Sequence, residues 1–127
     1  MFAFGSPDTA FVSPRHALYP HMTVFKNVQG DLMLRGWSRE EIAARIKEME
    51  SWPWLSPIFY RACRDLTTEE LYLAALARAL APEPGKLLAE LPENASEKIE
   101  SALDHIKNIL SLKVTPKKTG TAWNRQI

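Results

Sequence analysis

Cysteine and histidine are scarce in this sequence, and this limits the chemistry open to the chain. Cys63 is the single cysteine, and there are three histidines. One thiol cannot form an internal disulfide, and no cysteines and histidines recur at the spacing of a zinc site. A chain without disulfides favours a reducing compartment. We therefore expect a cytoplasmic protein that binds no metal and no cofactor.

Long hydrophobic runs and glycine-rich loops are missing as well. The longest apolar run, within residues 71–81, is interrupted by Arg78 and is too short to cross a bilayer. Residues 1–15 carry no basic region ahead of their apolar residues, so they do not predict a signal peptide. No phosphate-binding glycine loop and no paired-carboxylate motif occurs. These absences predict a protein that is not an enzyme, has no catalytic residue and does not enter a membrane.

Charge of either sign shows no large excess, because the formal net charge is +1. The distribution is nevertheless uneven. Residues 31–111 carry more acidic than basic side chains, whereas residues 112–127 contain four basic side chains and no acidic one. The sequence therefore predicts an acidic body followed by a basic tail.

The first 30 residues differ in composition from the rest. Prolines at positions 7, 14 and 20 exclude a long helix, because each ring removes a donor and clashes with the preceding turn. Residues 22–25 could form a short strand, but no second strand is evident to pair with it. We expect an extended arm whose aromatic side chains pack either on the chain's own core or on a partner.

Helical spacing and capping residues appear from Asp31 onward. Asp31 is the expected start of a short helix that ends at Gly36, where a left-handed residue is favoured. Ser38 and Glu41 form a capping box for a second helix that reaches Ser51.

Three more helices are predicted beyond this point. Ser56 followed by Pro57 is a typical helix start, and it predicts a helix over residues 57–66. A capping box at Thr67 precedes a helix over residues 68–81 that is apolar almost all round and belongs at the centre of a bundle. After an apolar turn at residues 86–91, a third box formed by Asn94 and Glu97 begins the most regular amphipathic helix.

Together these elements predict an all-α fold, a small bundle of about four main helices. We expect an extended, proline- and aromatic-rich N-terminal arm at residues 1–30, a helical domain at 31–112 and a flexible basic tail at 113–127.

The stretch LMLRGWSREEIAARI, residues 32–46, resembles the front half of a DNA-binding helix-turn-helix. It departs from that motif where the second helix runs on to Ser51 and is followed by Trp-Pro-Trp-Leu instead of a short turn. The resemblance and the basic tail support an alternative function, a regulator associated with DNA or RNA through residues 31–66 and the tail. The nucleic-acid-binding candidates are Arg35, Arg39, Arg45, Arg61, Arg64, Lys113, Lys117, Lys118, Trp123 and Arg125.

A thiolate–imidazole pair of Cys63 and His105 is the one catalytic arrangement that folding could assemble. Cys63 lies on the apolar stripe of its predicted helix, however, and a buried structural thiol is the more common case.

The function that the sequence favours is a non-catalytic adaptor, inhibitor or complex subunit that acts through protein–protein contacts or as a homo-oligomer. Tryptophan and tyrosine dominate such contacts, and the chain concentrates aromatic residues in the arm and around Pro53. We expect Trp54 and Phe59 in the core. The protein-binding candidates are Phe2, Phe4, Phe11, Trp37 and Trp52.

Overall fold

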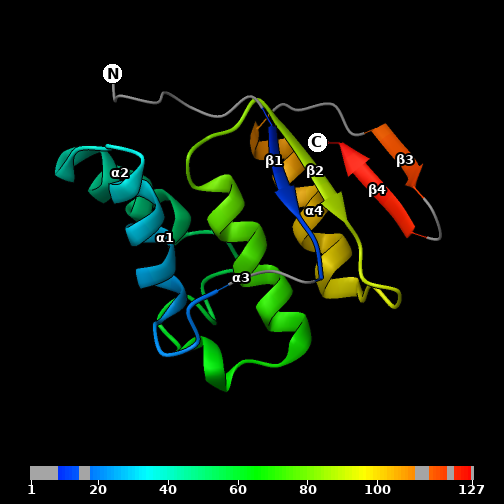
Figure 1. Ribbon diagram of the computed structural model, residues 1–127, viewed down its shortest axis with the longest axis horizontal. Coiled ribbons are helices and arrows are strands. Elements are labelled where there is room, and N and C mark those ends of the chain that lie inside the picture. The colour runs from blue at the N-terminus through cyan, green and yellow to red at the C-terminus, as the bar shows by residue number, and fades with distance from the viewer. Residues whose placement is uncertain (1–8, 15–17, 111–114, 120–121, 127) are drawn as a thin grey trace.

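The computed structural model of the chain describes residues 9–14, 18–110, 115–119 and 122–126, and it combines helices with a sheet (Figure 1). The described elements, in chain order, are β1 (Thr9–Val12), α1 (Val24–Leu34), α2 (Arg39–Met49), the 3-10 turn η1 (Cys63–Asp65), α3 (Thr68–Leu80), β2 (Lys86–Glu90), α4 (Glu97–Leu110), β3 (Thr115–Thr119) and β4 (Ala122–Gln126). The predicted all-α fold is therefore wrong, because the chain is an α/β protein.

The sheet has the strand order β1-β2-β4-β3. β1 and β2 are parallel, with Thr9 opposite Lys86 and Val12 opposite Ala89. β4 pairs antiparallel with both β2 and β3. Parallel neighbours need a crossover connection, and α1, α2 and α3 supply it between β1 and β2. In Figure 1 these three helices lie to one side of the two parallel strands.

β2 replaces the predicted apolar turn at residues 86–91. Its side chains alternate, so that Leu87 and Ala89 are fully buried whereas Lys86 is exposed. The sequence KLLAE consists of residues that favour helices, but pairing and burial against β1 override that weak preference. β1 lies within the predicted extended arm, and β3 and β4 lie within the predicted flexible tail, so the structure has strands where none was expected.

α1 begins earlier than predicted. Thr23 is its cap, with the hydroxyl oxygen accepting a hydrogen bond from the backbone N–H of Lys26 at 3.0 Å. The expected cap, Asp31, lies inside the helix and forms an ion pair with Arg35 at 2.9 Å. The short strand considered for residues 22–25 is reduced to an isolated bridge between Thr23 and Ala62. Gly36 follows with a φ of 85°, which confirms the left-handed residue expected there.

The capping boxes at Ser38 and Thr67 are confirmed. In each, the hydroxyl oxygen accepts from the third residue of the helix, and the glutamate at that position accepts from the backbone N–H of the cap. Both glutamates, Glu41 and Glu70, have a pKa below the usual value, mainly because of the bond from that backbone N–H. At α4 the hydroxyl of Ser96 accepts from Ile99, so Ser96 takes the place predicted for Asn94.

The helix predicted over residues 57–66 does not form. The chain makes consecutive turns instead, with the N–H of Ile58 bonded to Leu55 and that of Arg61 bonded to Ile58, followed by η1. The apolar residues of this segment are nevertheless buried, Phe59 and Cys63 among them. A helix and a series of turns can both bury these apolar side chains, and burial is what stabilises the segment. The apolar pattern therefore identified the inward-facing residues but not their backbone conformation.

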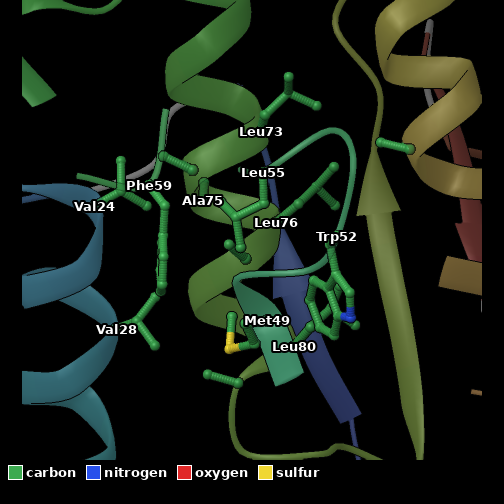
Figure 2. Packing of buried hydrophobic residues seen from close by; sticks show 14 of the residues in the cluster. Val24, Val28, Met49, Trp52, Leu55, Phe59, Leu73, Ala75, Leu76 and Leu80 are labelled. Atoms are coloured by element: carbon green, nitrogen blue, oxygen red, sulfur yellow. The ribbon is translucent and has the colours of Figure 1, made fainter. Parts of the chain in front are cut away.

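The core is arranged around α3 (Figure 2). Seven of the thirteen residues of α3 are buried, as expected for a central helix. It is surrounded by Val24 and Val28 of α1, Met49 of α2, and Leu55 and Phe59 from the turns between α2 and η1. α3 also contacts β1 and α4. The helix therefore joins the helical part of the molecule to the sheet.

Candidate functional site

The carboxyl ends of the parallel strands meet at one edge of the sheet. β1 ends at Val12 and continues into Ser13 and Pro14, and β2 ends at Glu90 and continues into the loop of residues 91–96. In open α/β sheets, ligands bind in the crevice outside the carboxyl ends of the strands. We therefore expect a binding site at this edge.

A cavity of about 340 Å³ opens at this edge. It lies between the start of α3, Pro14 after β1 and the loop after β2. Its polar lining consists of oxygen-bearing side chains and one amide: Thr68, Glu69, Tyr72, Glu93 and Asn94. Among the described residues, the lining contains no lysine or arginine. Such a lining suits a hard cation, which prefers oxygen ligands, and is unsuited to a bare anion.

Tyr72 fixes one wall of the cavity. Its hydroxyl donates a hydrogen bond of 2.9 Å to the backbone oxygen of Glu90, the last residue of β2. Since Tyr72 lies one turn into α3, this bond ties the helix to the strand end. The spacing between the start of α3 and the loop after β2 is thereby set.

A second concave surface lies between α1 and α2. We call it the α1–α2 groove. It has a volume of about 930 Å³, and its lining includes Phe25, Met33, Trp37, Ile42, Ile46 and Tyr60. Met33 and Tyr60 are more than half exposed, and the hydroxyl of Tyr60 donates to the carboxylate of Glu50 at the edge of the groove. Exposed apolar side chains lining a hollow are typical of a surface that binds another molecule.

The five predicted protein-binding residues lie in different environments. Trp37 lines the α1–α2 groove, and Phe11 is 70% exposed on β1. Trp52 is only 3% exposed and belongs to the core, so its assignment to a contact surface is wrong. Trp54, expected in the core, is partly exposed and stacks on Trp52 with ring centres 5.6 Å apart. Phe2 and Phe4 lie outside the described residues.

The predicted nucleic-acid-binding residues whose side chains the structure describes lie in different surroundings. Arg35 is paired with Asp31, and Arg61 with Glu70. Arg45 is buried. The remaining candidates are scattered: Arg39 lines the α1–α2 groove, Arg64 is exposed in η1, Lys117 and Lys118 belong to β3, Trp123 and Arg125 belong to β4, and Lys113 lies outside the described residues.

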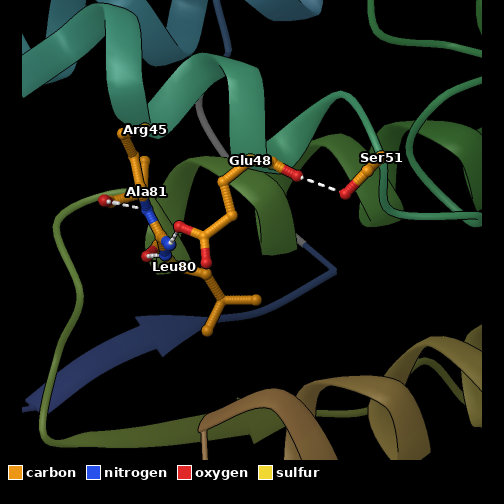
Figure 3. Close-up of polar contacts among 5 residues, drawn as sticks. All are labelled: Arg45, Glu48, Ser51, Leu80 and Ala81. Atoms are coloured by element: carbon orange, nitrogen blue, oxygen red, sulfur yellow. Dashed lines mark hydrogen bonds and ion pairs between the residues drawn. The ribbon is translucent and has the colours of Figure 1, made fainter.

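Arg45 has a structural role instead (Figure 3). Its Nε donates to the backbone oxygen of Ala81 at 2.9 Å, and its Nη2 donates to that of Leu80 at 2.8 Å. Nη1 pairs with Glu48 at 2.6 Å. The guanidinium also lies 5.2 Å from the ring centre of Trp52. With four partners inside the molecule, Arg45 is not positioned to contact a phosphate.

Cys63 and His105 do not form the catalytic pair considered from the sequence. The Sγ atom of Cys63 accepts a hydrogen bond from Asn27 at 3.4 Å, and burial raises the pKa of its thiol. His105 instead accepts from the indole of Trp54 at 2.9 Å. Within the described ranges, no three histidine, cysteine, aspartate or glutamate side chains gather where they could hold a metal ion.

No helix in the described part of the chain combines the length and apolar character that crossing a bilayer requires.

Comparisons with known proteins relate the chain to ATP-binding components of import systems. It is 39% identical over 85 residues to the molybdate/tungstate import ATP-binding protein WtpC of Pyrococcus abyssi, which covers 67% of this chain and 25% of that protein. It is 32% identical over 115 residues to the sn-glycerol-3-phosphate import ATP-binding protein UgpC of Cupriavidus necator, covering 90% of this chain and 30% of that protein. The chain thus spans less than a third of these relatives. No protein-family model matches it.

These similarities overturn three predictions. A non-catalytic adaptor is contradicted, because the relatives are ATP-binding import proteins. The prediction that the chain is no enzyme is contradicted for the same reason, and the alternative of a DNA- or RNA-associated regulator finds no support in the relatives or in the placement of the arginines. The sequence carried only a weak signal for β2, because the apolar residues 87–89 between Gly85 and Pro92 also favour helices. The chain is thus similar to ATP-binding import proteins, and its parallel pair β1–β2 is a feature of α/β folds.

Proposed function

We propose that the chain is a nucleotide-binding part of an import system, with ATP and Mg²⁺ at the carboxyl ends of β1 and β2. One observation carries the proposal: the sequence similarity to an import ATP-binding protein extends over 90% of this chain. In folds of this kind the strand ends are where nucleotides bind.

The lining of the cavity fits Mg²⁺ better than it fits the phosphates themselves. Mg²⁺ is usually held by one or two carboxylates, with water and substrate phosphate oxygens completing its coordination. Glu69 and Glu93 line the cavity and can supply those carboxylates. Bound Mg²⁺ would neutralise charge on the phosphates during hydrolysis, and Thr68 and Asn94 offer hydrogen bonds that orient a ligand beside it.

Binding the phosphates of ATP requires groups beyond those that line the cavity. A triphosphate is commonly held by a loop of the form G-x-x-x-x-G-K-S/T, and the 127 residues contain none. Gly85-Lys86 is followed by leucine, and position 80 is also leucine. We therefore assign the contacts to the β- and γ-phosphates to another polypeptide segment that adjoins this edge, and we expect this chain alone to bind nucleotide weakly.

Binding of a fluorescent ATP analogue to the purified chain, with and without Mg²⁺, tests this proposal. We expect saturable binding with a Kd of about 1 mM or lower that depends on Mg²⁺. Glu93→Gln should weaken it by about tenfold, because a carboxylate near the metal is lost. Glu40→Gln, which removes an exposed carboxylate from α2, is the matched control. Absence of saturable binding, or equal effects of the two variants, would contradict the assignment.

We further propose that the α1–α2 groove docks the membrane-spanning component of the import system, and that the chain acts on the cytoplasmic side. The relatives are named as import proteins. The groove offers exposed Met33 beside Trp37 and Ile42, an arrangement typical of helix-in-groove recognition.

Adjacent residues of α1 give a matched test of the docking surface. Met33 lines the groove, whereas Leu34, which is 80% exposed, does not. We expect Met33→Asp to abolish co-purification with an import system's membrane-spanning subunit from detergent-solubilised membranes, and Leu34→Asp to leave it unchanged. Retention of that subunit by Met33→Asp would rule out the groove as the docking surface.

A further inference from the structure

A third cavity lies apart from the β1–β2 edge and from the α1–α2 groove. It has a volume of about 560 Å³ and opens between α3, α4 and the connector of residues 52–58. We call it the α4 cavity. Its apolar lining comes from the connector and α3: Pro53, Trp54, Pro57, Ile58 and Leu73. Its size falls within the range of small-molecule sites, and two prolines stiffen the wall that carries the indole.

Trp54 and His105, which both line this cavity, are joined by a hydrogen bond. The indole N–H of Trp54 donates to Nδ1 of His105 at 2.9 Å. An Nδ1 that accepts a hydrogen bond carries no proton, so the proton of the neutral imidazole lies on Nε2. His105 therefore has a donor on the side of its ring away from Trp54.

The α4 wall of the cavity carries further donors. Lys98, Ser101 and His105 all line the cavity, and their spacing of three and four residues places them along one face of the helix. Lys98 forms no ion pair with a described carboxylate, although its charge contributes to lowering the pKa of Glu70. The row thus offers an ammonium, a hydroxyl and an imidazole N–H to one ligand.

Two acidic residues also line the cavity, but the donors still outnumber the carboxylates that remain for a ligand. Glu70 already accepts from the backbone N–H of Thr67 and pairs with Arg61 at 3.4 Å. Glu97 is exposed at the first position of α4, where the helix dipole favours a carboxylate. The polar groups that remain for a ligand are therefore mostly donors.

We propose that the α4 cavity binds an amphipathic organic anion, a carboxylate carried on a flat apolar ring. The ring lies against Trp54 and the apolar floor, and the carboxylate reaches Lys98 and His105. An exposed charge pair contributes little by itself, but a charge-assisted bond at the edge of an apolar cavity is stronger. This binding does not involve the nucleotide site, so each proposal can fail without the other.

Two ligands of opposite charge test the proposal on the unaltered chain. The ligands 3-phenylpropionate and phenethylamine share a ring and a two-carbon linker, and differ in carrying a carboxylate or an ammonium. The indole N–H resonance of Trp54, assigned with Trp54→Phe, reports occupancy in a nitrogen–proton NMR titration. We expect 3-phenylpropionate to shift it saturably and to bind at least about tenfold more tightly than phenethylamine.

Variants of α4 then locate the charge that is recognised. Lys98→Met should weaken the binding of 3-phenylpropionate by about tenfold. Lys107→Met removes the same charge from an exposed position outside the cavity and should change the affinity by less than about twofold. Equal or tighter binding of phenethylamine, no shift with either ligand, or equal effects of the two lysine variants would overturn the proposal. If a variant fails to fold, the comparison of the two ligands on the unaltered chain still decides.

Discussion

Arg45 shows how one side chain can connect two helices. The last carbonyls of a helix have no partner within that helix, and in α3 two of them, those of Leu80 and its neighbour Ala81, accept from the guanidinium. Only 4% of the surface of Arg45 is exposed. A positive charge at this position also complements the negative end of the α3 dipole. Arg45 thereby holds α2 against the end of α3.

We predict that Arg45→Met lowers the free energy of unfolding by about 2–3 kcal/mol, because buried carbonyl oxygens lose their donors. Arg45→Lys should recover only part of the loss, since an ammonium cannot reproduce the planar geometry of two separate bonds. Urea unfolding measures both. Arg39→Met removes an exposed arginine from the same helix and should stay within about 0.5 kcal/mol of the parent. Equal effects at both positions would show that the carbonyl contacts contribute nothing.

His105 makes a pH-dependent contribution to stability. Burial lowers the pKa of its imidazole, and protonation would also remove the acceptor used by Trp54. The unfolded chain therefore takes up this proton at a higher pH than the folded chain. The contribution is complete above the ordinary pKa range of histidine and is lost as the pH falls toward the folded-state value.

We predict that His105→Gln flattens the dependence of the free energy of unfolding on pH between about pH 5 and pH 8. Glutamine can still accept a hydrogen bond from Trp54 but does not titrate in this range. Urea unfolding at a series of pH values measures the slope. The same substitution at the exposed His21 serves as the control. A steeper profile in His105→Gln would be incompatible with this account.

Helix starts are determined mainly by residues that are close together in the sequence. The boxes at Ser38 and Thr67 need only residues within one turn, so they form wherever the rest of the molecule places the chain. Thr67 also fixes where α3 begins, and α3 carries the candidate cavity lining at Thr68 and Glu69.

We predict that Thr67→Ala costs about 1 kcal/mol of stability, because an N–H at the start of α3 loses its acceptor. Thermal unfolding followed by circular dichroism measures the change. Ser56→Ala, at an exposed serine in the connector, is the control and should be nearly neutral. A neutral Thr67→Ala would mean that water satisfies the helix start equally well.

β2 depends on tertiary contacts to a greater degree than the helix starts. Leu87 and Ala89 are buried in the core, whereas Lys86 is exposed. We predict that Leu87→Ala lowers the free energy of unfolding by about 2–5 kcal/mol through lost apolar burial and a residual cavity. Lys86→Ala should change it by less than about 0.5 kcal/mol. Denaturant unfolding of the two adjacent variants compares them directly, and similar losses would contradict the alternation.

At the scale of the whole molecule, α3 is the element on which the others are assembled. α1, α4 and β1 all contact it, and Figure 2 shows side chains from α1, α2 and the connector converging on it. The candidate cavity after β2 and the α4 cavity both use residues of α3 in their walls. Loosening α3 would therefore affect both sites together.

We predict that backbone amides of α3 between Tyr72 and Leu80 exchange with deuterium more slowly than those of the connector at residues 52–58. Opening α3 requires exposure of the main core, so its amides should exchange with a free energy close to that of global unfolding. Mass spectrometry of exchanged peptides measures the difference. Similar rates in both segments would indicate that the helical part opens independently of α3.

The predictions that succeeded depend on near neighbours in sequence. Capping boxes, the left-handed Gly36 and the buried character of α3 follow from residue types within one or two turns. The same local reasoning failed over residues 57–66, where a good helix start was outweighed by the burial of Phe59 in a series of turns. Local preference is worth tenths of a kilocalorie per residue, which core packing readily exceeds.

The sequence by itself thus determined where α2 and α3 begin, which face of α4 is apolar and which residues turn inward. Tertiary structure alone decided that Thr9–Val12 and Lys86–Glu90 are parallel partners, because their pairing joins segments separated by three helices and leaves no local pattern. The candidate site follows from that pairing. Its residues after β1, at the start of α3 and after β2 become neighbours only when the strand ends are aligned.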